Sequence, residues 1–145
     1  MIRSWCLLFL FFTSWGWSQD WQPSWEEALD KAQNKEQIIL LVFSGSDWCI
    51  PCIRLDNNVW KSSDFDNYTR NRFVLYRADF PKRKKNKLSQ QIQETHNRLA
   101  EKYNKNGYFP WVVILNTQLE LLGNLSYNNE TAVDFIKLIE RELNE

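Results

Sequence analysis

Hydrophobic residues along this chain form short continuous runs that alternate with helically spaced segments. Three runs, at 37–44, 73–79 and 111–115, are rich in branched and aromatic residues and too short for typical helices, so each predicts a β-strand. The first run is almost wholly apolar, which is typical of a central strand covered on both faces. Residues 119–125 follow an Asn-Thr-Gln turn and predict a fourth strand that forms a hairpin with the third.

Between these strands, apolar residues recur every three to four positions, as on one face of an α-helix. A capping box formed by Ser24 and Glu27 predicts the start of the first helix. This helix is expected to end near residue 34, with Trp25, Ala28 and Ala32 on its apolar face. Further helices are expected at about 49–58, as a short helix capped by Ser63 that contains Phe65 and Tyr68, from about Leu88 to Gly107, and from Asn129 or Thr131 to the C-terminal end.

The helix expected from about Leu88 carries the only histidine of the chain, His96. A single histidine on a helix is more often a surface or half-buried residue than a catalytic one, so we assign it no role. The helix is expected to end at Gly107, and its apolar face is expected to consist of Leu88, Ile92, Leu99 and Tyr103.

The order of the expected elements is α-β-α-α-β-α-β-β-α. Strands alternate with helices along most of the chain, and the chain ends with a hairpin and a helix. This order favours an α/β fold with a central mixed β-sheet flanked by helices on both faces. The length suits one domain with a substantial core.

The first 18 residues have the pattern of a secretory signal peptide. Arg3 lies in a short basic start, an apolar run covers residues 5–12, and small or polar residues at 13–18 suit cleavage after Ser18. The apolar run is shorter than the roughly 20 residues needed to span a bilayer, although an uncleaved membrane anchor is the alternative. We therefore expect a periplasmic or secreted protein whose mature domain is residues 19–145.

Charge is balanced, with 18 basic and 18 acidic residues in 145, and removal of residues 1–18 takes away only Arg3. No global attraction to nucleic acid follows, and no nucleic-acid partner is expected. The basic run at 82–87 is interpreted as a solvated loop or a frayed helix start. A docking patch for an acidic partner is the alternative, and the run lacks interleaved aromatic residues for stacking on bases.

Cys49 and Cys52 are the only cysteines left once Cys6 is removed with the leader. They follow the first predicted strand after a short turn, where a helix starts, which predicts a reversible dithiol/disulfide pair. A structural disulfide that closes a loop of only two intervening residues restricts the unfolded chain little, so the pair favours redox chemistry over a structural role. A tetrahedral zinc site needs four ligands, but residues 19–145 offer two cysteines and one histidine, so we expect no metal and no other cofactor.

Position relative to the helix start assigns the two cysteines different roles. Unpaired amides and the helix dipole favour negative charge at Cys49, which is therefore the predicted nucleophile. Cys52, one turn later and expected to be more buried, is predicted to resolve the mixed disulfide. Pro51 fits the first helical turn because it has no amide hydrogen. Trp48 presents an amphipathic ring beside the nucleophile and is predicted to contact the partner.

Residues 39–52 and the turn at 107–110 resemble the thioredoxin superfamily. Residues 25–28, 43–49 and 78–81 are similar to exported bacterial thioredoxin-like proteins of the disulfide reductase and thioredoxin-7 kind, and the similarity covers essentially all of residues 19–145. The resemblance implies a thioredoxin fold. It also implies that Pro110 follows a cis peptide bond and faces the cysteines, which leaves the Phe109 backbone free to pair with an extended substrate.

Two positions depart from the thioredoxin pattern. Phe43 replaces the buried acid that helps to move the proton of the second cysteine, so proton transfer to or from Cys52 has to use water, Asp47 or another group. Ile50 replaces the glycine of the thioredoxin Gly-Pro dipeptide, and its branched side chain is expected to narrow partner choice and to shift the redox potential.

Together these features predict an exported, monomeric thiol-disulfide oxidoreductase that reduces or isomerises the disulfides of other proteins. A membrane-bound or periplasmic dithiol protein is expected to exchange electrons with it. The alternatives are a non-catalytic peptide-docking module with a thioredoxin fold, and a thiol-based copper carrier, because soft thiolates bind copper. The predicted site consists of catalytic Cys49 and Cys52 with substrate-binding Trp48, Ile50, Pro51, Phe109 and Pro110.

Overall fold

The computed structural model describes residues 19–145, and the signal peptide predicted at 1–18 lies outside the described residues. Among these residues no helix has the length and apolar character needed to cross a membrane. The elements are α1 (Trp25–Lys35), β1 (Ile38–Ser44), α2 (Ile50–Leu55), the π-helical turn η1 (Asp56–Trp60), α3 (Ser63–Thr69), β2 (Phe73–Asp79), the 3-10 turn η2 (Lys84–Asn86), α4 (Gln90–Tyr103), β3 (Trp111–Leu115), β4 (Leu121–Leu125) and α5 (Ala132–Asn144).

The four strands form one mixed sheet in the order β2-β1-β3-β4. Strand β1 is parallel to β2, with Ile38 beside Phe73, and antiparallel to β3, with Leu41 opposite Val113. Strands β3 and β4 form the predicted antiparallel hairpin, which carries an irregularity at 114–115. The predicted fold class, a mixed α/β sheet of the thioredoxin type, is therefore confirmed.

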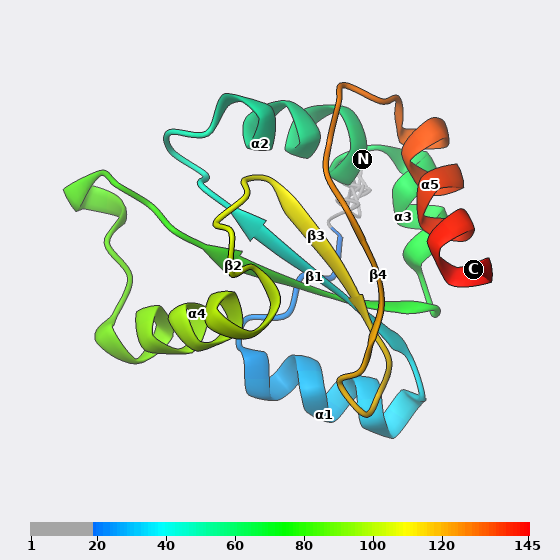
Figure 1. Cartoon of the computed structure of the whole chain (residues 1–145), viewed down its shortest axis with the longest axis horizontal. Helices are drawn as coiled ribbons and strands as arrows, with labels where there is room; N and C mark the ends of the chain where they lie inside the picture. Colours follow the sequence, from blue (N-terminus) through cyan, green and yellow to red (C-terminus); the bar gives the residue numbers. More distant parts are fainter. Residues whose placement is uncertain (1–18) are drawn as a thin grey trace, which may run out of the picture.

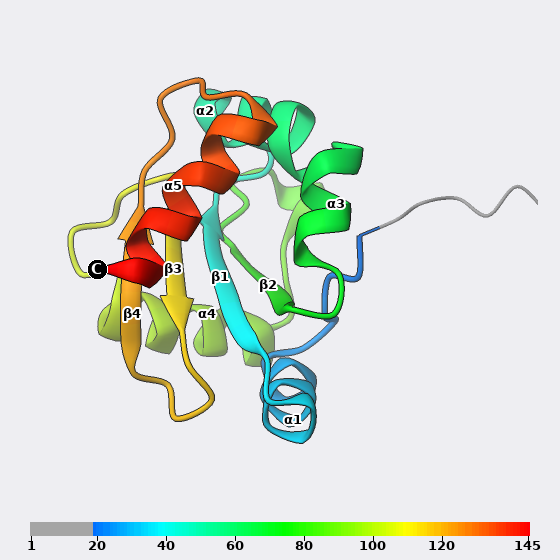
Figure 2. The same cartoon turned by 90° about the vertical axis from the view of Figure 1, so that its right-hand side faces the viewer.

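Side chains of β1 alternate between two hydrophobic cores because successive residues of a strand point to opposite faces. Leu40 and Val42 pack in the core beneath α2, η1, α3 and α5, whereas Ile39 and Leu41 pack against α1 and α4. Figures 1 and 2 show these two groups of helices on opposite faces of the sheet. Strand β1 is thus internal and covered on both sides, as its apolar run predicts.

Side-chain caps set where the helices begin. Ser24, Ser62, Ser89 and Thr131 each accept a hydrogen bond from the amide three residues later, which satisfies one of the free donors at a helix start. Thr131 is one of the two predicted starts of the last helix. The prediction that Ser63 caps the third helix is wrong by one residue, because the neighbouring Ser62 has the extended backbone of a cap.

Helix α4 differs from its prediction in both its buried face and its end. Ile92 is 41% exposed, and the buried residues are Thr95, His96 and Leu99. The helix ends at Tyr103 instead of running to Gly107, which lies in the following loop with a φ of 66°. The burial of His96 corrects the expectation of a surface or half-buried residue, and its physical reason is the pair of hydrogen bonds described below.

Candidate active site

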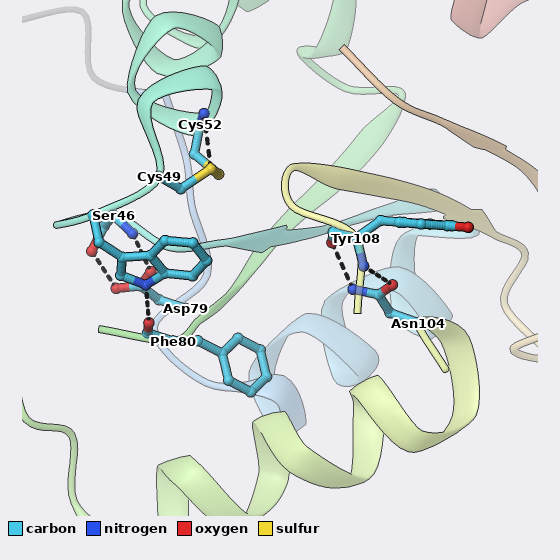
Figure 3. The surroundings of a disulfide bond; sticks show 8 residues. Ser46, Cys49, Cys52, Asp79, Phe80, Asn104 and Tyr108 are labelled. Carbon is cyan, nitrogen blue, oxygen red and sulfur yellow. Dashed lines mark hydrogen bonds between the residues drawn. A yellow bond between two sulfur atoms is a disulfide. The ribbon is translucent and has the colours of Figure 1, made fainter. Parts of the chain in front are cut away.

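Cys49 and Cys52 form a disulfide where α2 begins, with their Cα atoms 5.2 Å apart. The Sγ of Cys49 accepts a hydrogen bond from the Cys52 amide at 3.3 Å, so Cys49 caps the helix through its own sulfur. The expectation that Cys52 is the more buried cysteine is wrong, since both are 4% exposed. The disulfide bond holds both sulfurs together over the first turn of the helix (Figure 3), so the two cysteines are equally buried in this oxidised form.

The turn between β1 and Cys49 is fixed by Asp79 at the end of β2. The Asp79 carboxylate accepts hydrogen bonds from the Ser46 amide at 2.9 Å and from the Ser46 hydroxyl at 2.5 Å. Figure 3 shows Ser46 and Asp79 facing each other beneath the disulfide. Neither residue was selected from the sequence, and the signal that points to them is the position of Asp79 at the end of a strand parallel to β1.

Trp48 is held on three sides within this turn. Its indole N–H donates to the Phe80 carbonyl at 2.7 Å, and its ring meets the Phe109 ring edge-on, with centroids 5.5 Å apart. The ring also lies against Gly45, where an added Cβ would approach the Trp48 ring to 2.3 Å. Trp48 is therefore a half-buried, fixed side chain beside Cys49, and Gly45 allows this close packing.

The turn at 107–110 lies beside Trp48, the residue before Cys49, because the Phe109 ring contacts the Trp48 ring. The peptide bond between Phe109 and Pro110 is cis. The Asn104 side chain holds this turn, because its amide donates to the Tyr108 carbonyl and accepts from the Tyr108 amide, both at 2.9 Å. Figure 3 shows this paired contact. Asn104 is only 5% exposed, and sequence reasoning missed it.

The predicted substrate-binding residues differ in exposure. Ile50 is 59% exposed and Pro51 is exposed, so both lie on the surface around the disulfide, whereas Pro110 is buried. Phe109 is half-buried, and Tyr108, which the prediction did not include, is 53% exposed. The exposed rim of the disulfide therefore includes Ile50 and Pro51, whereas the Tyr108 ring points away from the cysteines and packs against Trp111 (Figure 3).

Phe43 is fully buried, in the position where thioredoxins carry an acid. It stacks on Phe80 with ring centroids 6.5 Å apart, and Phe80 in turn contacts Phe109. Asp47 was considered as a substitute for the acid. Its carboxylate accepts hydrogen bonds from the Lys82 amide, the Asn86 side chain and the Arg83 amide, which lower the pKa of Asp47 to about 2. Asp47 thus stays ionised and bound to this loop at neutral pH.

His96 links α4 to the end of β2. Its Nδ1 lies 2.8 Å from the Asp79 carbonyl oxygen, and its Nε2 lies 2.9 Å from the Tyr76 hydroxyl. A carbonyl can only accept, so Nδ1 carries the hydrogen and Nε2 accepts from Tyr76. Burial lowers the pKa of His96, against the opposing effect of the Asp79 carbonyl. The ring is therefore neutral at pH 7 and supports the strand end that holds Ser46.

This buried ring predicts a loss of stability in mild acid. Because the folded-state pKa of His96 is below the unfolded value of about 6.5, acid protonates the unfolded chain first, and stability falls as pH drops below that value. One proton gives a slope of at most about 1.4 kcal/mol per pH unit. Urea unfolding between pH 5 and 7.5 is expected to show this slope and to lose it in His96→Asn. An equal slope in the variant would contradict the assignment.

The family model described as thioredoxin-like matches residues 20–117, about two thirds of the chain. The chain belongs to the thioredoxin-like family. This assignment agrees with the mixed sheet and with the Cys49–Cys52 pair at the start of α2.

Two curated relatives of this thioredoxin-like protein come from Chlamydia pneumoniae. The disulfide bond reductase DsbH is 25% identical over 115 residues, which cover 79% of this chain and 68% of DsbH. The thioredoxin-related protein DsbJ is 27% identical over 111 residues, which cover 77% of this chain and 31% of DsbJ. The chain thus spans about a third of the length of DsbJ.

A solved structure of a DsbH oxidoreductase superposes on this thioredoxin-like protein with a TM-score of 0.80 and 24% identity, over 88% of this chain and 85% of the other. The fold is therefore the thioredoxin fold. A thioredoxin-like chain with a closed CxxC disulfide has the reactive pair of a thiol-disulfide oxidoreductase, the enzyme class predicted from the sequence. Within residues 19–145 no group of three or more His, Cys, Asp or Glu residues is placed to hold a metal ion.

Proposed function

We propose that this protein is an exported thiol-disulfide oxidoreductase that reduces or isomerises disulfides in other proteins. The observation that carries the proposal is the Cys49–Cys52 disulfide at the start of α2, in a thioredoxin fold. The relationship to a protein named as a disulfide bond reductase supports the reductive direction.

Cys49 is the nucleophile in the proposed reaction. The Cys52 amide already donates to the Cys49 sulfur at 3.3 Å, and this amide together with the helix start stabilises a thiolate. In the dithiol form, the Cys49 thiolate attacks a substrate disulfide. One substrate sulfur becomes bonded to Cys49, and the other leaves as a thiolate that takes up a proton.

Cys52 completes the exchange. Its thiolate attacks the Cys49 sulfur, the mixed disulfide breaks, and the second substrate sulfur leaves with two electrons. The protein then holds the Cys49–Cys52 disulfide seen in the structure. Phe43 replaces the buried acid, and the Asp47 carboxylate is a weak base engaged in hydrogen bonds from Lys82, Arg83 and Asn86. In this proposal, water therefore takes the Cys52 proton.

The substrate is an extended polypeptide segment that carries a disulfide. Within residues 19–145, no hydrogen bond uses the Phe109 backbone N–H or carbonyl, although the neighbouring Tyr108 backbone is bound by Asn104. These free groups suit pairing with a substrate strand. Ile50 and Pro51 offer exposed surface for its side chains.

Export rests on the leader pattern of residues 1–18, with cleavage after Ser18. In the periplasm, where disulfides persist, the oxidised protein is returned to the dithiol by a dithiol partner bound to the membrane or free in the periplasm. No nicotinamide or metal takes part in this cycle.

The test of this function is the reduction potential of the Cys49–Cys52 couple, measured by equilibration with glutathione and alkylation of free thiols. A reductase or isomerase is expected to lie between roughly −270 mV, as for thioredoxin, and roughly −180 mV, as for protein disulfide isomerase. A value near −120 mV indicates an oxidant instead. A pair that never cycles would reject the enzyme and leave the peptide-docking module. Copper bound to the reduced protein with no disulfide exchange would identify a carrier.

A further inference from the structure

Residues 82–87, here called the basic loop, form an exposed cationic segment that the proposed reaction does not use. Five of its six residues are basic and all six are exposed. No acidic residue occurs between Phe80 and Glu94, although the whole chain has equal numbers of basic and acidic residues. Five of the 18 basic residues of the chain therefore lie in one short segment that contains no acidic residue.

The basic loop is fixed to the turn that carries the cysteines. The Asp47 carboxylate, two residues before Cys49, accepts hydrogen bonds from the amides of Lys82 and Arg83 and from the Asn86 side chain, each at 2.9 Å. These bonds use the backbone and one neutral amide, so they leave the cationic heads of the loop directed elsewhere. The loop is solvent-exposed, as one expected interpretation has it, and it is also held beside the turn that leads to Cys49.

One cation of the loop reaches the edge of the site itself. The Lys82 ammonium lies 3.9 Å from the centroid of the Trp48 ring, a cation–π contact. The same ring meets Phe109, whose backbone forms no hydrogen bond with any described residue and so suits pairing with a substrate. The basic loop therefore borders the surface that an extended substrate would occupy.

The cations of the basic loop form no ion pairs with the acidic side chains of the described residues. Within residues 19–145, none of its five basic side chains forms an ion pair, whereas three other lysines and three arginines each pair with a carboxylate. A fixed group of unpaired cations attracts an oppositely charged partner and raises its rate of encounter by about 10-fold to 10³-fold at low ionic strength.

We propose that the basic loop is a docking surface for acidic polypeptide segments that flank the disulfide of a protein substrate. The inference rests on the proposed function, because the loop borders the site where that disulfide reacts. A polypeptide fits better than a nucleic acid, since Trp48, the aromatic residue next to the loop, is already covered by Lys82 and Phe109.

The test uses three synthetic peptides that contain the same intramolecular disulfide, flanked by aspartates, by serines or by lysines. The rate constant for reduction by the reduced protein is measured at low salt and at high salt. We expect the acidic peptide to react roughly 10-fold faster than the serine peptide at low salt, with the lysine peptide slowest, and the differences to disappear at high salt.

Charge reversal locates the effect. The variant Lys84→Glu/Lys85→Glu keeps the residues that contact Asp47 and Trp48, and it is expected to lose the preference for the acidic peptide. The matched control Lys35→Glu/Lys102→Glu changes the net charge equally at exposed sites on α1 and α4 and is expected to retain it. Both variants are expected to reduce the uncharged bis(2-hydroxyethyl) disulfide at the unaltered rate.

The outcomes separate the two proposals. If the unaltered protein fails to reduce the uncharged disulfide, the proposed function fails. If it reduces that disulfide but shows no preference among the peptides, or if the control variant also loses the preference, the docking inference alone is overturned. Binding to vesicles of phosphatidylglycerol and phosphatidylcholine that needs Lys84 and Lys85, without any peptide preference, overturns it in favour of a membrane surface.

Discussion

The variant Cys49→Ser is expected to lose disulfide exchange by roughly 10³-fold or more, the scale seen when a catalytic nucleophile is removed. A serine hydroxyl stays protonated at neutral pH and does not attack a disulfide. Turnover with a peptide disulfide and a regenerating dithiol measures this loss. Urea unfolding serves as the control for correct folding. Because the variant cannot form the disulfide, its free energy of unfolding is compared with that of the unaltered protein kept reduced by excess dithiol.

The variant Cys52→Ser is expected to give a different result from Cys49→Ser. Its Cys49 still attacks a substrate disulfide, but no second thiol releases the product, so mixed disulfides accumulate. Mass spectrometry after alkylation detects them as adducts on Cys49. Adducts in Cys49→Ser but not in Cys52→Ser would reverse the two roles. Retention of peptide binding with adducts in neither variant would indicate the docking module.

The variant Trp60→Ala is expected to cost the largest amount of stability, about 3–5 kcal/mol of the free energy of unfolding. Trp60 is 2% exposed and is packed by three aromatic rings, with ring centroids at 4.6 Å for Phe65, 5.5 Å for Phe135 and 5.9 Å for Trp21. Removal of the indole leaves a cavity between η1, α3 and α5, because the surrounding elements close it only in part.

Urea unfolding of the oxidised protein measures the effect of Trp60→Ala, with Trp60→Phe as the matched control. The phenylalanine variant keeps a ring in the cluster and is expected to lose less than half as much. Because η1 continues the helix that begins with Cys49 and Cys52, this helix is also expected to unfold at a lower urea concentration in the alanine variant than in the unaltered protein. A loss below about 1 kcal/mol would show that Trp60 contributes little to the core.

Local patterns were sufficient to locate most of the elements. The apolar runs at 73–79 and 111–115 are strands β2 and β3 with the predicted bounds. The helix predicted from the capping box at Ser24 begins at Trp25, as expected. These signals work because strand alternation, helical spacing and caps all involve residues close in the sequence. The pair Cys49 and Cys52 was found for the same reason.

Which residues of α4 are buried depends on contacts with distant parts of the chain, and these cannot be read from the local sequence. Ile92 has the apolar side chain and the helical spacing of a core residue, yet it is 41% exposed, whereas His96 is 3% exposed. A polar ring can be buried when both nitrogens are hydrogen-bonded. The partners of His96, Tyr76 and the Asp79 carbonyl, lie on β2, 20 and 17 residues away along the chain.

The sequence by itself determined the reactive pair, the strand that leads to it and the turn that contains Pro110. Only the tertiary structure decided how these parts are held together. Asp79 binds Ser46 across 33 residues, and Asp47 binds the basic loop across 35 to 39 residues. A carboxylate accepts from many donors, and the packing of β2 beside β1 decides which distant donor lies within reach.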